Sequence, residues 1–172
     1  TVYTPYSRRW MERYRSVPPE YRKGVSDRNF STSDFAFPTL ESIGFKPSSI
    51  SVPPYDLSVA DSYQERRDYP AKEGTSRLSP HLRFGTVSIR KIVSELRPVH
   101  ETFRGELIWR EFFMQILYHF PQVVDHNFKR KYDGVSWRND ENDFEAWCRG
   151  ETGYPLVDAG MRELNQTGYM HN

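Results

Sequence analysis

Apolar residues recur at helical spacing through the second half of the chain, and proline or glycine ends the stretches that carry them. The longest stretch predicts a helix from Thr102 to Phe120, which Pro121 ends because proline cannot continue a helix. Ser79 and Pro80 predict another helix start, with a capping hydroxyl followed by proline. Shorter helices are expected over residues 8–15, 57–68, 79–85, 88–96, 143–149 and 155–166.

The first half of the chain is more polar and is repeatedly interrupted by proline. Nine of the twelve prolines fall at or before Pro80. Residues 21–55 contain four of them and exceed the usual length of a connection, so we expect a linker laid over another part of the protein. No stretch alternates as a β-strand does, and none approaches the length of a membrane-spanning helix. The sequence therefore predicts a mostly α-helical fold preceded by a long, loop-rich linker.

One face of the predicted central helix combines charged and aromatic residues. At about 100° per residue, Glu106, Arg110, Phe113 and Leu117 share this face, and Trp109 lies beside them. The rest of the circumference is largely apolar, as expected of a helix enclosed by its neighbours. Two interpretations are open. The charges form an ion pair along the helix, worth about 0.2–0.5 kcal/mol, or they face a polar ligand, because buried charges need a partner.

A second stretch, Glu73–Gly85, places three hydroxyl side chains, those of Thr75, Ser76 and Ser79, before a predicted helix. Free backbone amides at a helix start favour an anion. Gly74 permits a close approach of the backbone. The stretch lacks the lysine and the glycine spacing of a Walker loop. Capping of the helix by Ser79 explains the same pattern, so an anion site and a simple cap are both open.

Charge adds little to this picture. The net charge is +1, from 24 basic and 23 acidic residues, so overall electrostatics do not indicate nucleic-acid binding. Residues 64–91 carry seven Lys or Arg against three acids, whereas residues 139–163 carry seven acids against two bases. These segments are either two solvated faces or, for the first, a basic binding strip. The Lys-Arg-Lys run at residues 129–131 is expected to be solvated.

Cysteine and histidine usage narrows the chemistry. The single cysteine, Cys148, excludes an internal disulfide and suits a reducing cytosol, and no charged-then-apolar leader opens the chain. We therefore expect a cytoplasmic protein. The five histidines lack metal-ligand spacing, so no metal site is expected.

Four longer stretches are distinctive when taken together: "YTPYSRRW", "RDYPAKEGTSRLSPHLRFGTVS", "ELIWREFF" and "TGYPLVDAGMRELNQTGYMHN". In their order and spacing they resemble the DNA photolyase/cryptochrome family, and "ELIWREFF" is most like class I dimer photolyases. The resemblance implies that residues 1–56 are the tail of an antenna domain and the interdomain linker. It implies that residues 57–172 are the N-terminal half of an all-helical FAD-binding domain. An antenna chromophore is expected in the N-terminal domain, whose body this sequence lacks.

The resemblance also implies roles for residues at a flavin. Phe103 occupies a position where relatives often have a tryptophan beside the flavin. Arg110 resembles an arginine that serves both the flavin and the substrate. The residues expected to contact FAD are Tyr63, Thr75, Ser76, Arg77, Leu78, Ser79, Phe103, Arg110 and Asn172.

On the substrate side, Glu106 resembles an acid that hydrogen-bonds a pyrimidine dimer, and Trp109 resembles the aromatic wall on which the flipped dimer packs. These two are the expected catalytic residues, and a protonated Glu106 would hydrogen-bond the dimer as negative charge develops. Arg67 resembles a contact to the DNA backbone, and Trp137 the outermost tryptophan of an electron-transfer chain. The expected DNA contacts are Arg67, Glu106, Trp109, Arg110, Phe113 and Asn172.

The family implies light-dependent DNA repair, in which excited reduced FAD passes an electron to a cyclobutane pyrimidine dimer, the ring splits and the electron returns. Trp109 favours repair, because many signalling cryptochromes replace it. Two alternatives stay open: a blue-light photoreceptor without repair activity, and an inactive truncated scaffold. With half of a flavin pocket, the isolated chain is expected to bind FAD weakly or not at all, to lack activity, and to associate with itself through uncovered apolar faces.

Overall fold

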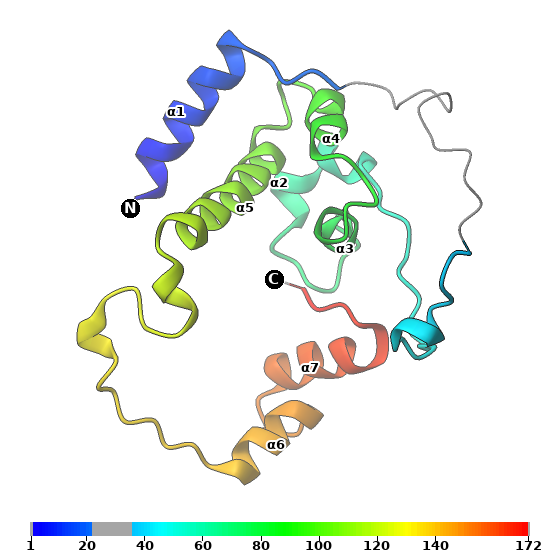
Figure 1. The fold of residues 1–172 in the computed structure, drawn as a ribbon, viewed down its shortest axis with the longest axis vertical. Helices are drawn as coiled ribbons and strands as arrows, with labels where there is room; N and C mark the ends of the chain where they lie inside the picture. The colour runs from blue at the N-terminus through cyan, green and yellow to red at the C-terminus, as the bar shows by residue number, and fades with distance from the viewer. Residues whose placement is uncertain (1, 22–35, 172) are drawn as a thin grey trace. The chain divides into compact units, whose positions relative to one another are not determined.

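Helices make up the regular secondary structure of the computed structural model, which describes residues 2–21 and 36–171. No β-strand occurs in these ranges, which confirms the mostly α-helical fold predicted from the sequence. The α-helices, labelled in Figure 1, are α1 (Tyr3–Ser16), α2 (Tyr63–Arg66), α3 (Ser79–Arg83), α4 (Ile89–Glu95), α5 (Glu101–His119), α6 (Glu141–Arg149) and α7 (Pro155–Thr167). Short 3-10 helices are η2 (Glu41–Ile43), η3 (Ser58–Asp61), η4 (Pro121–Val124) and η5 (Arg130–Tyr132).

The chain divides into two compact units. One comprises Thr1–Glu20 and Pro54–Phe144, and the other comprises Tyr21–Pro53 and Glu145–Asn172. The first unit contains α1 to α5, including every described residue expected to contact FAD or DNA. A domain division at residue 56 stays a prediction from the family resemblance.

The long helices begin and end close to their predicted bounds. Helix α5 starts one residue before the predicted Thr102 and ends one residue before Phe120. Helix α7 begins at Pro155 and ends before Gly168, whose φ of 72° is the left-handed conformation that glycine adopts most readily at a helix end. These termini follow directly from proline and glycine chemistry.

Three local predictions were wrong. The helix expected over residues 57–68 is divided into η3 and α2, because Ser62 leaves the helical conformation with a φ of −116°. The helix expected over residues 8–15 is longer and spans Tyr3–Ser16, since Pro5 is tolerated in a first turn. Ser79 is the first residue of α3 and not its cap; the N-cap is Leu78, without a side-chain capping bond.

The main hydrophobic core lies between η3, the loop before α3, and helices α4 and α5. Each of its side chains larger than alanine contributes about 1.5–3 kcal/mol when fully removed from water. Its buried members are Ala60, Leu78, Ile92, Val93, Leu96, Phe103 and Leu107.

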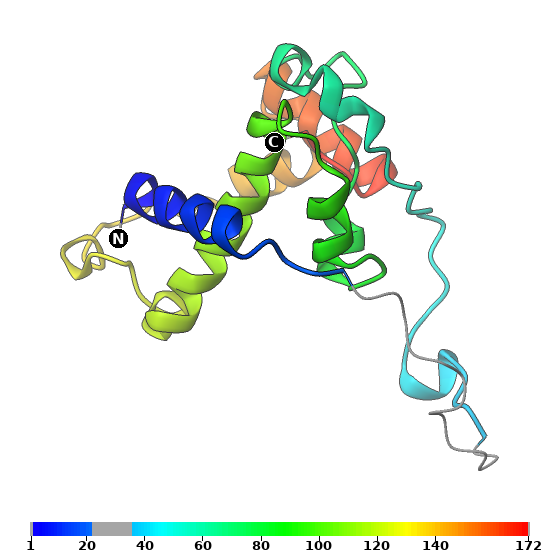
Figure 2. The same cartoon turned by 90° about the horizontal axis from the view of Figure 1, so that it is seen from above.

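Helix α5 is enclosed along only part of its length. Its N-terminal half is buried at Phe103, Leu107 and Ile108, whereas its C-terminal half is exposed at Leu117 and Tyr118. Helix α1 crosses α5 and covers one of its faces (Figure 2). The expectation of a fully enclosed central helix is therefore wrong for its C-terminal turns.

A polar contact fastens η3 to the start of α5. The buried ring of His100 accepts a hydrogen bond at Nδ1 from the Arg97 backbone N–H (3.2 Å). Because Nδ1 accepts, Nε2 carries the proton and donates to Oδ1 of Asp61 at 2.7 Å. This bond, with the nearby Arg97 guanidinium, lowers the pKa of Asp61 below its usual 3.8. We call these three residues the Asp61–His100 contact.

The second unit is organised around Asp158 of α7. This buried carboxylate accepts hydrogen bonds from the Thr152 N–H (2.8 Å), the Thr152 hydroxyl (2.6 Å) and the Gly153 N–H (3.0 Å). These donors lower the pKa of Asp158, the Thr152 hydroxyl most of all. Asn165 donates to the Cys148 carbonyl at 2.8 Å and thereby joins α7 to the end of α6.

Candidate functional site

The acidic residue on the face of α5 pairs with an arginine from another element. The Nη1 atom of Arg67, immediately after α2, donates to Oε1 of Glu106. Both side chains are largely shielded, at 26% and 35% exposed respectively. The Glu106 hydrogen bond is the main reason that the pKa of Arg67 rises above its usual value. Arg67 also lies 5.3 Å from the centre of the Tyr63 ring.

Arg110 has a different partner. Its Nη2 donates to the carbonyl of Leu82 in α3, at 3.3 Å. The helical ion pair between Glu106 and Arg110, one of the two interpretations of the sequence, is thus replaced by contacts from α5 to two other elements. Glu106 reaches toward α2, and Arg110 reaches toward α3. Helix α5 is therefore linked through Glu106 to the residue after α2 and through Arg110 to α3.

The loop between α2 and α3 carries the hydroxyl residues expected at a flavin. Gly74 and Ser76 are buried, whereas Thr75 is half-buried and Ser79 is exposed. A Cβ on Gly74 would lie 2.9 Å from both the Cβ and the carbonyl oxygen of Arg66, so only glycine permits this approach of the loop to α2. The close neighbour of Gly74 in this structure is thus Arg66, and the expected approach of this backbone to an anion stays a prediction.

Within the same loop, Arg77 adopts a φ of 52°, an uncommon conformation for a residue with a side chain. Its guanidinium pairs with Glu73 at 3.0 Å. The carbonyl of Ser76 accepts a hydrogen bond from the backbone N–H of Asp56 at 3.0 Å. The loop is thus held by contacts at Ser76 and Arg77, within its hydroxyl segment.

Two residues expected at FAD are used for packing in this structure. Phe103 and Leu78 are each 4% exposed and belong to the main core. The rings of Phe103 and Tyr63 meet edge to face, with centroids 5.1 Å apart. Tyr63 is partly buried, so it is the more accessible residue of this pair. Direct contact of Phe103 or Leu78 with a flavin stays a prediction.

Trp109 stacks on a residue that the sequence did not single out. The rings of Tyr3 and Trp109 are parallel within 4°, with centroids 3.4 Å apart. The Tyr3 hydroxyl donates to the Gly105 carbonyl at 3.1 Å. Burial, and then the charge of Glu106, raise the pKa of Tyr3 above its usual 10.0. Helix α1 therefore covers one face of the indole.

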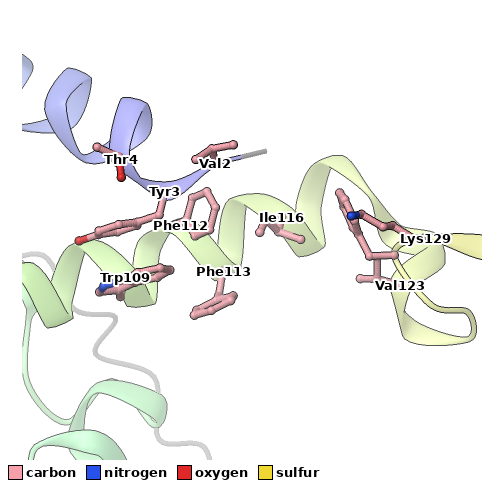
Figure 3. A pocket seen from close by; sticks show the side chains of 10 residues that line it. Val2, Tyr3, Thr4, Trp109, Phe112, Phe113, Ile116, Val123 and Lys129 are labelled. Carbon is pink, nitrogen blue, oxygen red and sulfur yellow. The ribbon is translucent and has the colours of Figure 1, made fainter. Parts of the chain in front are cut away.

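An apolar pocket of about 670 Å³ opens beside this aromatic stack (Figure 3). Phe113 extends the stack, because its ring lies within 24° of the Trp109 plane at a centroid distance of 5.6 Å, and it is 59% exposed. The pocket is lined by Val2, Tyr3, Thr4, Trp109, Phe112, Phe113, Ile116, Val123, Phe128 and Lys129. Its volume is within the range of about 300–1,000 Å³ typical of small-molecule sites.

The remaining predicted residues lie elsewhere. Trp137 is 74% exposed and lies between η5 and α6. Asn172 lies outside the described residues. Sequence reasoning missed Tyr3 and Lys129 as neighbours of the site. The "YTPY" motif could have drawn attention to Tyr3. The spacing of residues alone did not predict that Tyr3 packs on α5.

Within residues 2–21 and 36–171, none of the helices has the length and apolar character that a membrane span needs. In the same part of the chain, His, Cys, Asp and Glu side chains do not gather in groups of three or more that could hold a metal ion.

Comparison of the sequence with known proteins shows what this chain is similar to. The family described as "FAD binding domain of DNA photolyase" matches residues 103–172. A deoxyribodipyrimidine photo-lyase of Halobacterium salinarum is 38% identical over the whole chain and 41% of its own length. The enzyme of the same name from Agrobacterium fabrum is 47% identical over 64% of the chain and 25% of its own length. The Escherichia coli one is 33% identical over 99% of the chain.

The chain spans less than half the length of these curated relatives, which is 41% for both the Halobacterium and the Escherichia coli proteins. Within that span the similarity runs from end to end of the chain and includes α5, with Glu106, Trp109 and Arg110. The chain belongs to the DNA photolyase family.

Proposed function

We propose that this chain forms the lesion-facing wall of a light-dependent DNA repair enzyme, which uses reduced FAD to split cyclobutane pyrimidine dimers. The observation that carries the proposal is the ion pair of Glu106 and Arg67 where α2 meets α5, close to the contact of Arg110 with α3. The names of the curated relatives support it, since each is a deoxyribodipyrimidine photo-lyase.

The residues around the α2–α3 loop suit FAD by their chemistry. Hydroxyls of Thr75, Ser76 and Ser79 are donors for a diphosphate, and the Arg110 guanidinium adds a cation that is held toward α3. FAD, when bound, supplies the electron that splits the dimer and receives it back. The protein's own part is to orient the two partners and to place charge where it develops.

Arg67 provides that charge, and Glu106 holds its guanidinium in place. Splitting a dimer by one electron places transient negative charge on the pyrimidines, and a fixed cation at hydrogen-bond distance stabilises such charge. Arg67, with its raised pKa, is protonated throughout the accessible pH range. A dimer that hydrogen-bonds Glu106 shares this carboxylate with Arg67 or displaces it. Arg67 then becomes available to a phosphate of the same strand.

Trp109 offers the dimer an aromatic surface once Tyr3 has moved. Enzymes that act on a base extrude it from the duplex and hold it against aromatic or apolar side chains, and photolyases are among them. In this structure Tyr3 occupies one face of the indole at stacking distance. Binding of a dimer on that face therefore requires displacement of the N-terminal turn of α1.

The exposure of Trp137, at 74%, supports its assignment as an outer electron relay, because such a relay exchanges electrons with groups in solvent. Class I membership and an antenna chromophore follow from the resemblance alone. Self-association is a further prediction, prompted by large apolar side chains on the surface such as Phe37 and Tyr118.

The test uses the protein that carries this chain, loaded with reduced FAD and given ultraviolet-irradiated oligothymidine. We expect dimers to disappear under blue light and not in the dark. Trp109→Ala should weaken dimer binding about 5- to 150-fold, the loss that corresponds to about 1–3 kcal/mol per stacked base. Light-induced spectral change without any dimer loss would contradict repair and favour a photoreceptor.

A further inference from the structure

The pocket beside the aromatic stack has an uneven distribution of charge. Nine of its ten lining residues are uncharged, and the tenth is Lys129. Lys129 lies beyond Ile116, at the end of the pocket away from Trp109 (Figure 3). Among the described residues its amine has no acidic partner, whereas the neighbouring Lys131 lies 4.8 Å from the Tyr132 ring. A single cation at the end of an apolar pocket is suited to an amphipathic anion.

The rings at the other end suit a flat, unsaturated group. Tyr3, Trp109 and Phe113 form a nearly parallel series, and Phe113 has the exposed outer ring. Aromatic rings next to a cation are the combination by which proteins bind single-stranded nucleic acid, with bases on the rings and phosphates on the cations. A ligand with both features is a strand of DNA with an unstacked base.

The spacing also fits a strand. Trp109 and Ile116 are seven residues apart on α5, about 10.5 Å along the helix axis at a rise of about 1.5 Å per residue. Successive phosphates of one strand advance about 3.4 Å along a duplex axis. A strand with a base on the Trp109–Phe113 rings thus spans α5 as far as Ile116 within about three nucleotides, and Lys129 lies beyond Ile116 at that end of the pocket.

From this geometry we propose that Lys129 binds a backbone phosphate of the strand whose unstacked base lies on Phe113. The proposal rests on the proposed function, because it makes DNA the ligand of the pocket. It assigns a specific role to a lysine within a basic run that the sequence alone suggested was merely solvated. One bound phosphate releases counterions from the strand, so the contact has a signature in the salt dependence of binding.

The experiment measures affinity for a labelled oligothymidine that contains one dimer, at salt concentrations from 50 to 200 mM. For Lys129→Ala, the slope of log affinity against log salt should be smaller in magnitude by about 0.7, the contribution of one single-strand phosphate. Its affinity should therefore fall about 2.6-fold less over that range than the parent's. Lys129→Arg should restore the parent slope. Arg130→Ala is the matched control, because Arg130 is exposed, carries the same charge and does not line the pocket.

The outcomes separate the two proposals. If the salt-dependence slope of Lys129→Ala equals that of the parent, or if Arg130→Ala changes the slope as much as Lys129→Ala does, the phosphate contact is overturned. The repair function is then left untouched. The protein could instead show the predicted slope change, yet bind dimer-containing DNA no better than undamaged DNA and repair no dimers. That result would support the phosphate contact and contradict the repair function. Absence of any DNA binding by the parent overturns both. Circular dichroism checks that the variants are folded, as expected for substitutions of exposed side chains.

Discussion

Arg67 and Glu106 pair although they are 39 residues apart in the sequence. Their pairing shows which properties of single residues the sequence predicts and which it does not. The helical spacing placed Glu106 on one face with Arg110. The family resemblance identified both of these residues and Arg67. It did not predict which arginine pairs with the acid, because that depends on how α2 approaches α5. The close approach permitted by Gly74 was predictable, because glycine has no Cβ, whereas its neighbour Arg66 was not.

Gly74 provides a residue-scale prediction for the expected flavin loop. In Gly74→Ala the new Cβ would meet Arg66 at 2.9 Å, so the loop or α2 must shift. We expect a loss of about 1–3 kcal/mol in the free energy of unfolding, typical of overpacking. Urea denaturation measures this change.

Gly105→Ala is the matched control, because Gly105 lies inside α5 and a Cβ there would meet nothing within 4 Å. Alanine is the better helix former by about 1 kcal/mol, so this variant should be as stable as the parent or more stable. Equal destabilisation by both substitutions would show that the Gly74 contact is not the cause.

Helices show a clear difference between what spacing predicts and what packing decides. The bounds of α5 and α7 were predictable because Pro121, Pro155 and Gly168 act locally. The break at Ser62 was not, since it arises where η3 turns to place Ala60 in the core and Asp61 against His100. Packing of α1 on α5 likewise depends on long-range contacts that periodicity does not encode.

The Asp61–His100 contact gives an element-scale prediction about pH. The folded-state pKa of Asp61 is lowered, so its contribution to stability is present above about pH 3.8 and is lost as pH falls through the lowered value. Asp61→Asn should therefore be less stable than the parent at pH 7 and should lose less stability on acidification. Urea denaturation at several pH values between 3 and 7 measures both effects.

Asp125→Asn serves as the control for acidification, because Asp125 is exposed and forms no ion pair within the described residues. It should follow the parent curve. If Asp61→Asn also followed the parent at every pH, the contact would carry no stability.

Helix α1 gives the second element-scale prediction, because Tyr3 covers the Trp109 indole. Tyr3→Ala should expose that face and make Trp109 fluorescence more accessible to acrylamide. The Trp109 signal is the difference between proteins with and without Trp109→Phe. Tyr3→Ala should also improve dimer binding, since the N-terminal turn of α1 then need not be displaced from the indole. Unchanged quenching would mean that α1 does not cover the indole in solution.

At the scale of the whole molecule, the chain spans 41% of the length of its Halobacterium relative, so it carries only part of the surface that such a protein presents to a cofactor. We expect a protein of these 172 residues alone to bind FAD weakly or not at all. Absorption spectra before and after addition of FAD measure this. Tight, stoichiometric flavin on the purified chain would contradict the expectation and show that α2, α3 and α5 suffice.

The central claim is that the α5 surface bearing Glu106 faces both FAD and the lesion, and the quantum yield of dimer splitting in Glu106→Gln tests it most directly. Glutamine keeps the size of the side chain but removes the charge that pairs with Arg67. Because the pair is partly exposed, stability should change by no more than about 1 kcal/mol. The account predicts a yield at least about tenfold lower in the fully reduced, dimer-saturated protein, because the charge on Arg67 is then no longer held in place. A yield equal to the parent's would contradict it.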